Sequence, residues 1–179
     1  MNNRINNISK LIPVVGIYYL NKEYSIVVTQ KNLLTCLNFL KNHINYKFSI
    51  LSCVSGVDII TSEYRFAVVY DLLSIEYNLR LKVKVFVNEV TSVPTVIPIY
   101  KNANWWEREV WDMYGVYFQD HPDLRRILTD YGFEGYPLRK DFPLSGYVEV
   151  RYDLSKKRIV VEPLELAQEF RSFEYETPW

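Results

Sequence analysis

The chain has 179 residues, of which 49% are hydrophobic, so it is long enough for one domain with a substantial core and room for an appendage. Its 21 basic and 21 acidic residues cancel, which excludes a strong overall field that would attract nucleic acid or anionic lipid. No apolar run approaches the roughly 18 residues needed to cross a bilayer, so we expect a soluble or peripheral protein.

The first hundred residues predict an α+β domain. Short loops between the later strands favour antiparallel pairing, so we expect a small, mostly antiparallel sheet covered by helices. The strand at 80–87 alternates cleanly, with Leu81, Val83, Val85 and Val87 on one side. The expected elements are a hairpin of 14–20 and 24–29 with a three-residue loop, a helix over 30–43, strands over 48–54, 64–73 and 80–87, and turns at 56–58 and 76–78.

A second helix is expected over 105–114. Asn102-Ala103-Asn104 offers an N-cap, and Gly115 closes the helix. At 100° per residue, an apolar arc forms on one side while Arg108, Glu109 and Asp112 gather around Trp105 on the other. Because Arg108 and Asp112 are four residues apart, they predict an ion pair on the helix face.

The chain then loses its periodicity up to Tyr152. Residues 105–152 contain four of the six glycines and three of the eight prolines, together with many aromatic rings. A long structureless run is uncommon inside a compact domain unless it is functional or disordered, and the rings argue against disorder. We therefore expect a segment that is ordered against another protein. Three short elements are predicted within and after it, namely a helix over 124–128 capped by Asp123, a strand over 159–161 and a helix over 164–170.

Cofactor chemistry is poorly supported by the composition. Iron–sulfur clusters need about four cysteines and structural zinc needs four Cys or His ligands, whereas the chain has two of each, without close spacing. Haem, dinucleotide and phosphate-loop motifs are missing. We therefore expect no cofactor or metal on this chain, and two buried thiols, Cys36 and Cys53, rather than a disulfide.

Other site chemistries have simpler explanations. His121 and Asp123 resemble an acid–base pair, with Arg125 beside them, but His121-Pro122 more simply starts a turn. Glu107, Arg108 and Glu109 are more simply residues of a helix face than metal ligands or an acid–base pair. Arg and Tyr residues in 120–141 resemble a single-strand-binding surface, yet four basic residues meet five acidic ones there. Arg, carboxylates and interleaved rings instead favour a protein–protein interface.

About fifty residues of this segment resemble the 30-kilodalton subunit family of respiratory complex I, the proton-pumping NADH:quinone oxidoreductase. The resemblance opens with a Glu-Arg-Glu-x-x-Asp element, continues through a His-Pro-x-Leu-Arg-Arg element and ends in a Phe-x-Gly-x-Pro-Leu-Arg-Lys-Asp-Phe-Pro element. One departure is Tyr136, where many members have His. The matching residues are Glu107, Arg108, Glu109, Asp112, Gly115, Phe118, His121, Pro122, Leu124, Arg125, Arg126, Phe133, Gly135, Pro137, Leu138, Arg139, Lys140, Asp141, Phe142 and Pro143.

The resemblance implies a core structural subunit with no active site of its own. It would sit in the peripheral arm and support the subunit similar to hydrogenase large subunits that helps form the quinone site, while FMN and iron–sulfur clusters lie in other subunits. Residues 1–100 would be the α+β domain, and 101–179 a helix plus an extended subunit-binding segment. The expected interface residues are Trp105, Glu107, Arg108, Glu109, Asp112, His121, Asp123, Arg125, Arg126, Phe133, Arg139, Lys140, Asp141 and Phe142.

Compartment and rival functions stay open at this level. A composition rich in Asn, Lys, Ile, Tyr and Phe favours an organelle-encoded chain, hence the matrix side of the mitochondrial inner membrane, with the cytoplasmic side of a bacterial membrane as the alternative. Membrane association would come only through the complex. The alternatives are the equivalent subunit of a membrane-bound hydrogenase-type complex and, from a different class, an RNA-binding module.

Overall fold

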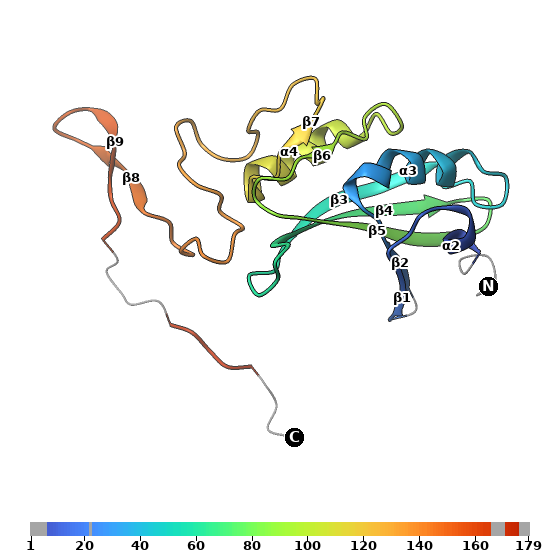
Figure 1. Cartoon of the computed structure of the whole chain (residues 1–179). Helices are drawn as coiled ribbons and strands as arrows, with labels where there is room; N and C mark the ends of the chain where they lie inside the picture. The colour runs from blue at the N-terminus through green and yellow to red at the C-terminus, as the bar shows by residue number, and fades with distance from the viewer. Residues whose placement is uncertain (1–6, 22, 166–170, 176–179) are drawn as a thin grey trace. The chain divides into compact units, whose positions relative to one another are not determined.

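The computed structural model in Figure 1 describes residues 7–21, 23–165 and 171–175. The chain divides into two compact units, Met1–Lys140 and Asp141–Trp179. Each unit is described by itself below.

The first unit is built on a five-stranded sheet with the strand order β1-β2-β5-β4-β3. All neighbouring strands pair antiparallel except β2 and β5, which are parallel. This confirms the predicted α+β fold with a mostly antiparallel sheet. The strands are β1 (Gly16–Leu20), β2 (Glu23–Val27), β3 (Ile50–Asp58), β4 (Phe66–Ser74) and β5 (Leu79–Val87).

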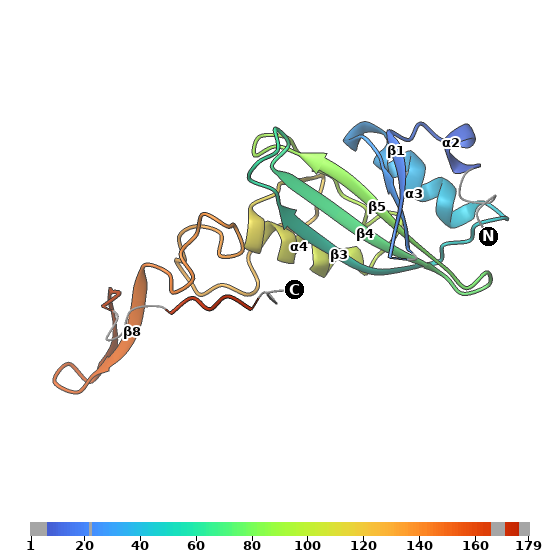
Figure 2. The ribbon, with the colours of Figure 1, turned by 90° about the horizontal axis from the view of Figure 1, so that it is seen from below.

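Helices cover one face of this sheet, and the other face is open. The predicted helix over 30–43 is present as a 3-10 turn η1 (Gln30–Asn32) followed by α3 (Leu33–Asn42). Its buried residues, Leu33, Cys36, Leu37 and Leu40, follow helical spacing and pack into the core. A four-residue helix, α2 (Ile8–Leu11), buries Ile8 in the same core. From below, in Figure 2, the strands lie in front of α3 and α4 (Ala103–Tyr114).

The alternation predicted for β5 is confirmed. Leu81, Val83, Val85 and Val87 are buried on the helix-covered face, and the residues between them are partly exposed. Because a strand changes face at every residue, Lys82 and Lys84 stand on the open face.

Two turns differ from the prediction. In the first hairpin Leu20 pairs with Glu23, so Glu23 belongs to β2 and not to the predicted three-residue loop. The predicted turn Gly56-Val57-Asp58 is wrong, since β3 continues through Asp58. Glycine serves a packing purpose there, because a Cβ at Gly56 would lie 2.5 Å from Cδ2 of the Tyr114 ring on α4. The glycine at position 56 therefore marks a close approach between α4 and β3, and not a turn.

The predicted second helix is confirmed as α4. It ends at Gly115, whose φ of +76° is the left-handed conformation of a C-cap. Asn102 occupies the N-cap position, but its amide donates to the Leu51 carbonyl, 2.7 Å away, and not to the helix. Two short parallel strands flank α4 in the sequence, β6 (Val93–Pro94) and β7 (Phe118–Gln119).

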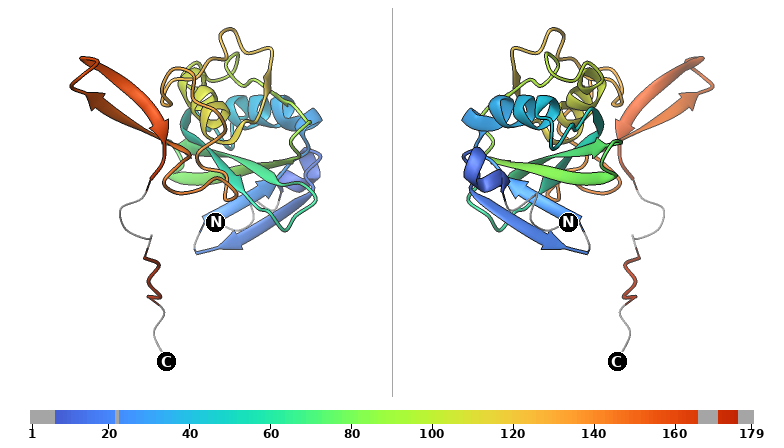
Figure 3. Two further views of the ribbon diagram at one scale, coloured as in Figure 1. Left: turned by 90° about the vertical axis from the view of Figure 1, so that its left-hand side faces the viewer. Right: turned by 90° about the vertical axis from the view of Figure 1, so that its right-hand side faces the viewer.

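The second unit contains an antiparallel hairpin, β8 (Val148–Asp153) and β9 (Arg158–Pro163), drawn in orange-red in Figure 3. The strand predicted over 159–161 is confirmed within β9, whereas β8 was missed. The helix predicted over 164–170 falls mostly on residues outside the described ones. Residues 164 and 165 have no regular structure.

Candidate partner interface

Helix α4 carries charged side chains into the interior of the first unit. Glu107 and Asp112 are fully buried, and Arg108 is nearly so. The helical arcs placed Arg108 and Asp112 on a polar side, but that side of α4 is covered by the chain that follows the helix. Each of these groups must therefore find polar partners inside the protein.

Asp112 organises the loop at 127–129. Its Oδ2 accepts the backbone N–H groups of Ile127, Leu128 and Thr129 at 3.1, 2.7 and 3.0 Å, and its Oδ1 accepts the Thr129 hydroxyl at 2.7 Å. Burial alone would raise the pKa of Asp112, but the hydrogen bonds from Thr129 and the three amides lower it below the usual value. The carboxylate is therefore held ionised as an anchor for the loop.

These contacts overturn two predictions. The helix predicted over 124–128 is wrong, because the amides at 127–129 turn onto Asp112 and no helix forms. The predicted ion pair between Arg108 and Asp112 is also wrong. Arg108 Nε instead donates to the Arg125 carbonyl at 3.3 Å, and its guanidinium lies over the Trp105 ring, 4.8 Å from the centroid.

Glu107 joins α4 to the chain around β6. Its two oxygens accept the Thr95 hydroxyl at 2.6 Å and the Val96 N–H at 2.7 Å. Burial raises the pKa of Glu107 to about 7, although the hydrogen bonds from Thr95 and Val96 act in the opposite direction. Glu107 therefore titrates close to neutral pH, in contrast with Asp112.

His121 lies beside this carboxylate, with Nε2 3.8 Å from Glu107 Oε2 and 3.3 Å from the Asn104 carbonyl. Its Nδ1 accepts the Asp123 N–H at 3.1 Å, so a neutral His121 carries its proton on Nε2. The Asp123 carboxylate pairs with Arg125 at 3.0 Å on the surface rather than with the imidazole. The geometry is that of a turn starting at His121-Pro122, as the simpler interpretation predicted.

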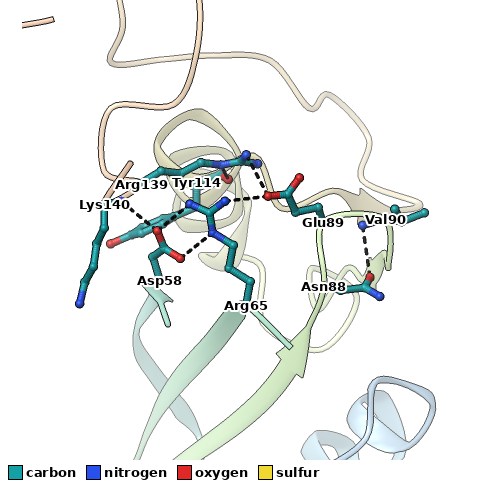
Figure 4. Close-up of polar contacts among 8 residues, drawn as sticks. All are labelled: Asp58, Arg65, Asn88, Glu89, Val90, Tyr114, Arg139 and Lys140. Atoms are coloured by element: carbon teal, nitrogen blue, oxygen red, sulfur yellow. Dashed lines mark hydrogen bonds and ion pairs between the residues drawn. The ribbon is translucent and has the colours of Figure 1, made fainter. Parts of the chain in front are cut away.

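A network of arginines and carboxylates anchors the end of the first unit, at Arg139 and Lys140 (Figure 4). Asp58 accepts Nε and Nη2 of Arg65 at 2.8 and 3.0 Å and the Lys140 N–H at 2.8 Å. The hydrogen bond from Arg65 is the main cause that lowers the pKa of Asp58. Glu89 links Arg65, at 2.8 Å, to Arg139, at 3.5 Å. The sequence does not predict the roles of Asp58 and Arg65, because Gly56-Val57-Asp58 has the pattern of a turn.

Arg139 is enclosed by its own unit. Its Nε donates to the Tyr114 carbonyl at 2.8 Å, and its guanidinium lies 4.9 Å from the Phe66 centroid and 4.5 Å from the Tyr136 centroid. Tyr136 also faces Arg126 at 5.0 Å and covers Gly115. Tyr136, the departure noted in the sequence, thus packs between two guanidinium groups.

The predicted interface residues fall into three groups by exposure. Glu107, Arg108 and Asp112 are internal anchors, and Glu109, His121, Arg126, Phe133, Arg139 and Phe142 are half-buried as whole residues, although the His121 side chain itself is fully buried. Trp105, Asp123, Arg125, Lys140 and Asp141 are exposed. The buried Arg108 links the exposed Trp105 and Arg125 on the first unit through the contacts described above. Asp141 and Phe142 belong to the second unit.

Exposed apolar side chains accompany the exposed members of the first unit. The segment after α4, residues 115–140, is held by contacts of Asp112, Asp58 and Arg139. Several of its large hydrophobic side chains nevertheless remain exposed to solvent. They are Tyr117, Leu128, Tyr131 and Leu138, in addition to Trp105 on α4. Such a rigid surface with aromatic and Arg residues has the composition of a protein-binding site.

The hairpin of the second unit has one apolar face that sequence reasoning missed. The residues opposite each other on this face are Val148 and Pro163, Val150 and Val161, and Tyr152 and Ile159. Its five named hydrophobic residues other than proline are 55–66% exposed. The other face is polar, with Arg151 Nη2 2.5 Å from Glu162 Oε1. The missed signal was the alternation Val148, Val150, Tyr152, which the glycine- and proline-rich context obscured.

Neither a metal centre nor a membrane helix is evident among residues 7–21, 23–165 and 171–175. No group of three or more His, Cys, Asp or Glu side chains in these ranges could hold a metal ion. No helix in the described part is long and apolar enough to cross a bilayer.

Comparisons with known proteins agree on one family. The family profile described as "Respiratory-chain NADH dehydrogenase, 30 Kd subunit" matches residues 26–148. The chain is 56% identical to NADH-ubiquinone oxidoreductase subunit 9 of Reclinomonas americana over 161 residues, covering 90% of this chain and 79% of the relative. It is 49% identical to the subunit 9 of Prototheca wickerhamii, covering 99% of this chain and 94% of the relative.

A plant relative and a solved structure extend this picture. The NADH dehydrogenase [ubiquinone] iron-sulfur protein 3 of Beta trigyna is 57% identical, covering 82% of this chain and 77% of the relative. The solved structure is a chain of the membrane-bound sulfane sulfur reductase, an archaeal respiratory membrane complex. It superposes with a TM-score of 0.68 at 26% identity, covering 80% of this chain and 85% of that one.

Proposed function

This chain belongs to the family of the 30 kDa subunit of respiratory-chain NADH dehydrogenase, and we propose that it acts in complex I as a non-catalytic brace for the quinone-site subunit. Its role as a subunit of NADH-ubiquinone oxidoreductase follows from the family and from relatives at 49–57% identity. The brace would use two surfaces, the segment after α4 and the hairpin β8–β9.

The bare apolar face of the hairpin is the observation that carries this proposal. An isolated two-stranded hairpin is at best marginally stable in water. Clustered exposed hydrophobic residues on one side, with an ion pair on the other, indicate a surface that is buried against a partner. The partner proposed here is the subunit similar to hydrogenase large subunits, which lies next to the quinone site.

The segment after α4 supports the same role through its internal anchors. Because Asp112 and Asp58 hold the backbone at 127–129 and at Lys140, the exposed Trp105 and Arg125 are presented from a fixed frame. A preorganised surface loses less conformational entropy on binding than a mobile one. Arg125 would pair with carboxylates on the neighbouring subunit in bidentate fashion.

The chain is proposed to hold no cofactor. Burial raises the pKa of the Cys36 thiol to about 12 and of the Cys53 thiol to about 11. Metal and cluster ligation require thiolates, so both cysteines are poorly suited to it. Iron analysis of the purified chain after reconstitution with iron and sulfide tests this point, and stoichiometric bound iron would contradict it.

Neighbouring residues of β9 provide a matched test of the hairpin. Val161 belongs to the apolar face, whereas Val160 points to the polar face, so Val161→Glu and Val160→Glu make the same chemical change on opposite sides. Burying a carboxylate in place of a valine costs several kcal/mol, so Val161→Glu is expected to lower assembled complex on native gels by roughly tenfold or more. Val160→Glu should assemble normally. Equal assembly of both variants would contradict the proposed role of the hairpin.

Arg125 gives an independent test of the other surface. Its side chain is 71% exposed and, among the described residues, forms an ion pair with Asp123, whose side chain is 57% exposed, so Arg125→Ala should leave the isolated chain stable. Loss of a buried interfacial charge typically costs about 2–5 kcal/mol, so the same variant should show reduced assembly. Normal amounts of active complex would remove Arg125 from the interface.

A mitochondrial location is consistent with the eukaryotic relatives that the chain matches. We place the subunit on the matrix side of the inner membrane as part of the proposal, with membrane association through the complex. Protease protection of the chain in intact organelles, lost on opening the inner membrane, is the expected result. The likeness to the sulfane sulfur reductase chain, at 26% identity, is weaker than the identity to complex I subunits.

A further inference from the structure

Two ionisable side chains meet in the interior of the first unit. The side chains of Glu107 and His121 have no exposed surface, and Nε2 of His121 lies 3.8 Å from Oε2 of Glu107. In the described part of the chain, His121 is the one basic side chain within ion-pair distance of this carboxyl group. A buried carboxylate without a permanent cation is costly, so the pair is a place where a proton is held or released.

The other groups around Glu107 provide hydrogen bonds and no counter-charge. Thr95 and Val96, which follow β6, contribute a hydroxyl and an N–H. Tyr70 of β4 is fully buried, and its hydroxyl has no hydrogen-bond partner among the described residues. Burial and the Glu107 charge both raise the pKa of Tyr70, so its hydroxyl stays neutral. Charged residues of the surrounding elements are bound elsewhere, namely Arg108 to the Arg125 carbonyl, Asp58 to Arg65 and Lys41 to the Ile99 carbonyl.

The contacts of Glu107 fit a protonated carboxyl group. Oε1 can accept the Val96 N–H as a carbonyl oxygen, while Oε2 can carry the proton and donate it to the Thr95 hydroxyl, 2.6 Å away. The imidazole of His121 is less suited to take this proton, because its Nδ1 already accepts the Asp123 N–H at 3.1 Å. A proton on Nδ1 would point at that amide. Burial raises the pKa of Glu107 to about 7, in agreement with a proton on the carboxyl group.

The Nε2–H of His121 has two acceptors within reach. Nε2 lies 3.3 Å from the Asn104 carbonyl oxygen and 3.8 Å from Oε2 of Glu107. A protonated carboxyl group is a weak acceptor, so the long bond to Asn104 is kept in that state. An ionised carboxylate is the stronger acceptor, and a movement of about 1 Å by the imidazole would bring Nε2 to hydrogen-bond distance from it.

We propose that Glu107 and His121 form a buried proton switch, in which the proton on Glu107 decides which oxygen atom the imidazole binds. With the proton present, Nε2–H stays on the Asn104 carbonyl in the first turn of α4. When the proton leaves Oε2 for the solvent, Nε2–H moves to the Glu107 carboxylate. His121 also begins the turn that leads to Arg125, so the switch acts on the frame of that residue. This last consequence rests on the proposed function, whereas the switch itself belongs to the isolated chain.

Nuclear magnetic resonance of the isolated full chain tests the switch, with 15N in the histidine rings and 13C in the glutamate carboxyl groups. The Glu107 carboxyl carbon should titrate with a midpoint near pH 7. As the pH rises through this midpoint, the Nε2–H proton of His121 should shift downfield while Nδ1 stays unprotonated. A Glu107 midpoint near the ordinary 4.5 would overturn the proposal. So would a proton on Nδ1 of His121 while Glu107 is still ionised.

A matched pair of variants assigns the shift to its cause. Glu107→Gln removes the ionisation and should abolish the shift of the His121 Nε2–H signal, whereas Glu109→Gln makes the same change two residues along α4 and should retain it. His43 is an internal reference, because its Nδ1 accepts the Asn45 N–H at 3.2 Å in the same way, whereas its ring packs against aromatic side chains. The His43 signals should be the same in wild type and both variants.

Two outcomes of these measurements would refute the coupling. One is a His121 signal that still shifts in Glu107→Gln, and the other is a His121 signal that stays constant while Glu107 titrates in wild type. The second readout needs no variant, so it decides the question even where Glu107→Gln does not fold. Neither readout uses the complex, so failure of the hairpin or Arg125 tests leaves both unaffected.

Discussion

Replacing Asp112 by Asn tests whether the buried carboxylate holds the segment after α4. The side chain keeps its size and loses its charge, while four donors still converge on it: the amides of Ile127, Leu128 and Thr129 and the Thr129 hydroxyl. An amide can offer only one oxygen to them and adds two donors of its own. An Asn oxygen in the place of Oδ2 can still accept the three amides, but without a charge, and the NH2 group in the place of Oδ1 can no longer accept the Thr129 hydroxyl.

The size of the effect follows from these bonds. Hydrogen bonds to a charged group contribute about 1.5–3 kcal/mol each, and a buried donor left unsatisfied costs about 1–3 kcal/mol. Because some bonds survive in the amide, we expect the free energy of unfolding at pH 7 to fall by about 2–4 kcal/mol. Urea denaturation of the isolated full chain, followed by tryptophan fluorescence, measures it. Asp123→Asn, in a surface pair, is the control and should change stability by less than about 0.5 kcal/mol.

The pH dependence provides a second readout of the same anchor. The pKa of Asp112 is lowered in the folded state, so its stabilisation is present above the unfolded pKa near 3.8 and is lost as pH falls through the folded value. The difference between wild type and Asp112→Asn should therefore shrink as the pH is lowered below about 4. A difference within about 0.5 kcal/mol at pH 7, or one that is constant with pH, would refute the reasoning.

Three further changes probe the internal contacts. Glu107 has a raised pKa of about 7 against 4.5, so folding becomes less favourable as pH rises between these values, and Glu107→Gln should remove this slope in urea titrations at pH 4.5–8. Gly56→Ala places a Cβ 2.5 Å from the Tyr114 ring and should lower stability by about 1–3 kcal/mol, visible as a lower Tm. Arg139→Ala removes a side chain that is only 17% exposed and should destabilise the isolated chain by about 1–3 kcal/mol, whereas Arg125→Ala should not, as paired urea curves would show. An unchanged slope, Tm or urea midpoint would contradict the corresponding contact.

Regular elements were predictable because their signals are local. The spacing of Leu33, Leu37 and Leu40 predicts α3, and the alternation from Leu81 to Val87 predicts β5. The parallel pairing of β2 with β5 was not predictable from short loops. It joins strands separated by α3, β3 and β4, so no local pattern reports it.

The candidate site was only partly predictable for a related reason. Helical spacing correctly places Arg108 next to Trp105, and the four-residue spacing of Arg108 and Asp112 then suggests that these two pair. The structure separates them because 127–129 supplies three amides to Asp112, and amides carry no residue-specific signal. The role of Asp58 is equally hidden in the sequence. Its partner at Lys140 is a backbone N–H 82 residues away, which no local pattern reveals.

The residues of α4 and of the chain that follows it therefore divide into two classes with different physical roles. Asp112 and Glu107 are buried, Arg139 is half-buried, and all three are bound within the first unit, so their removal acts on folding before it acts on binding. Trp105 and Arg125 are exposed and should cost little to remove from the isolated chain, so their removal acts mainly through a partner. A variant that lowers assembly without changing the stability of the isolated chain belongs to the second class. Comparing the two measurements for each residue separates the scaffold from the interface that it presents.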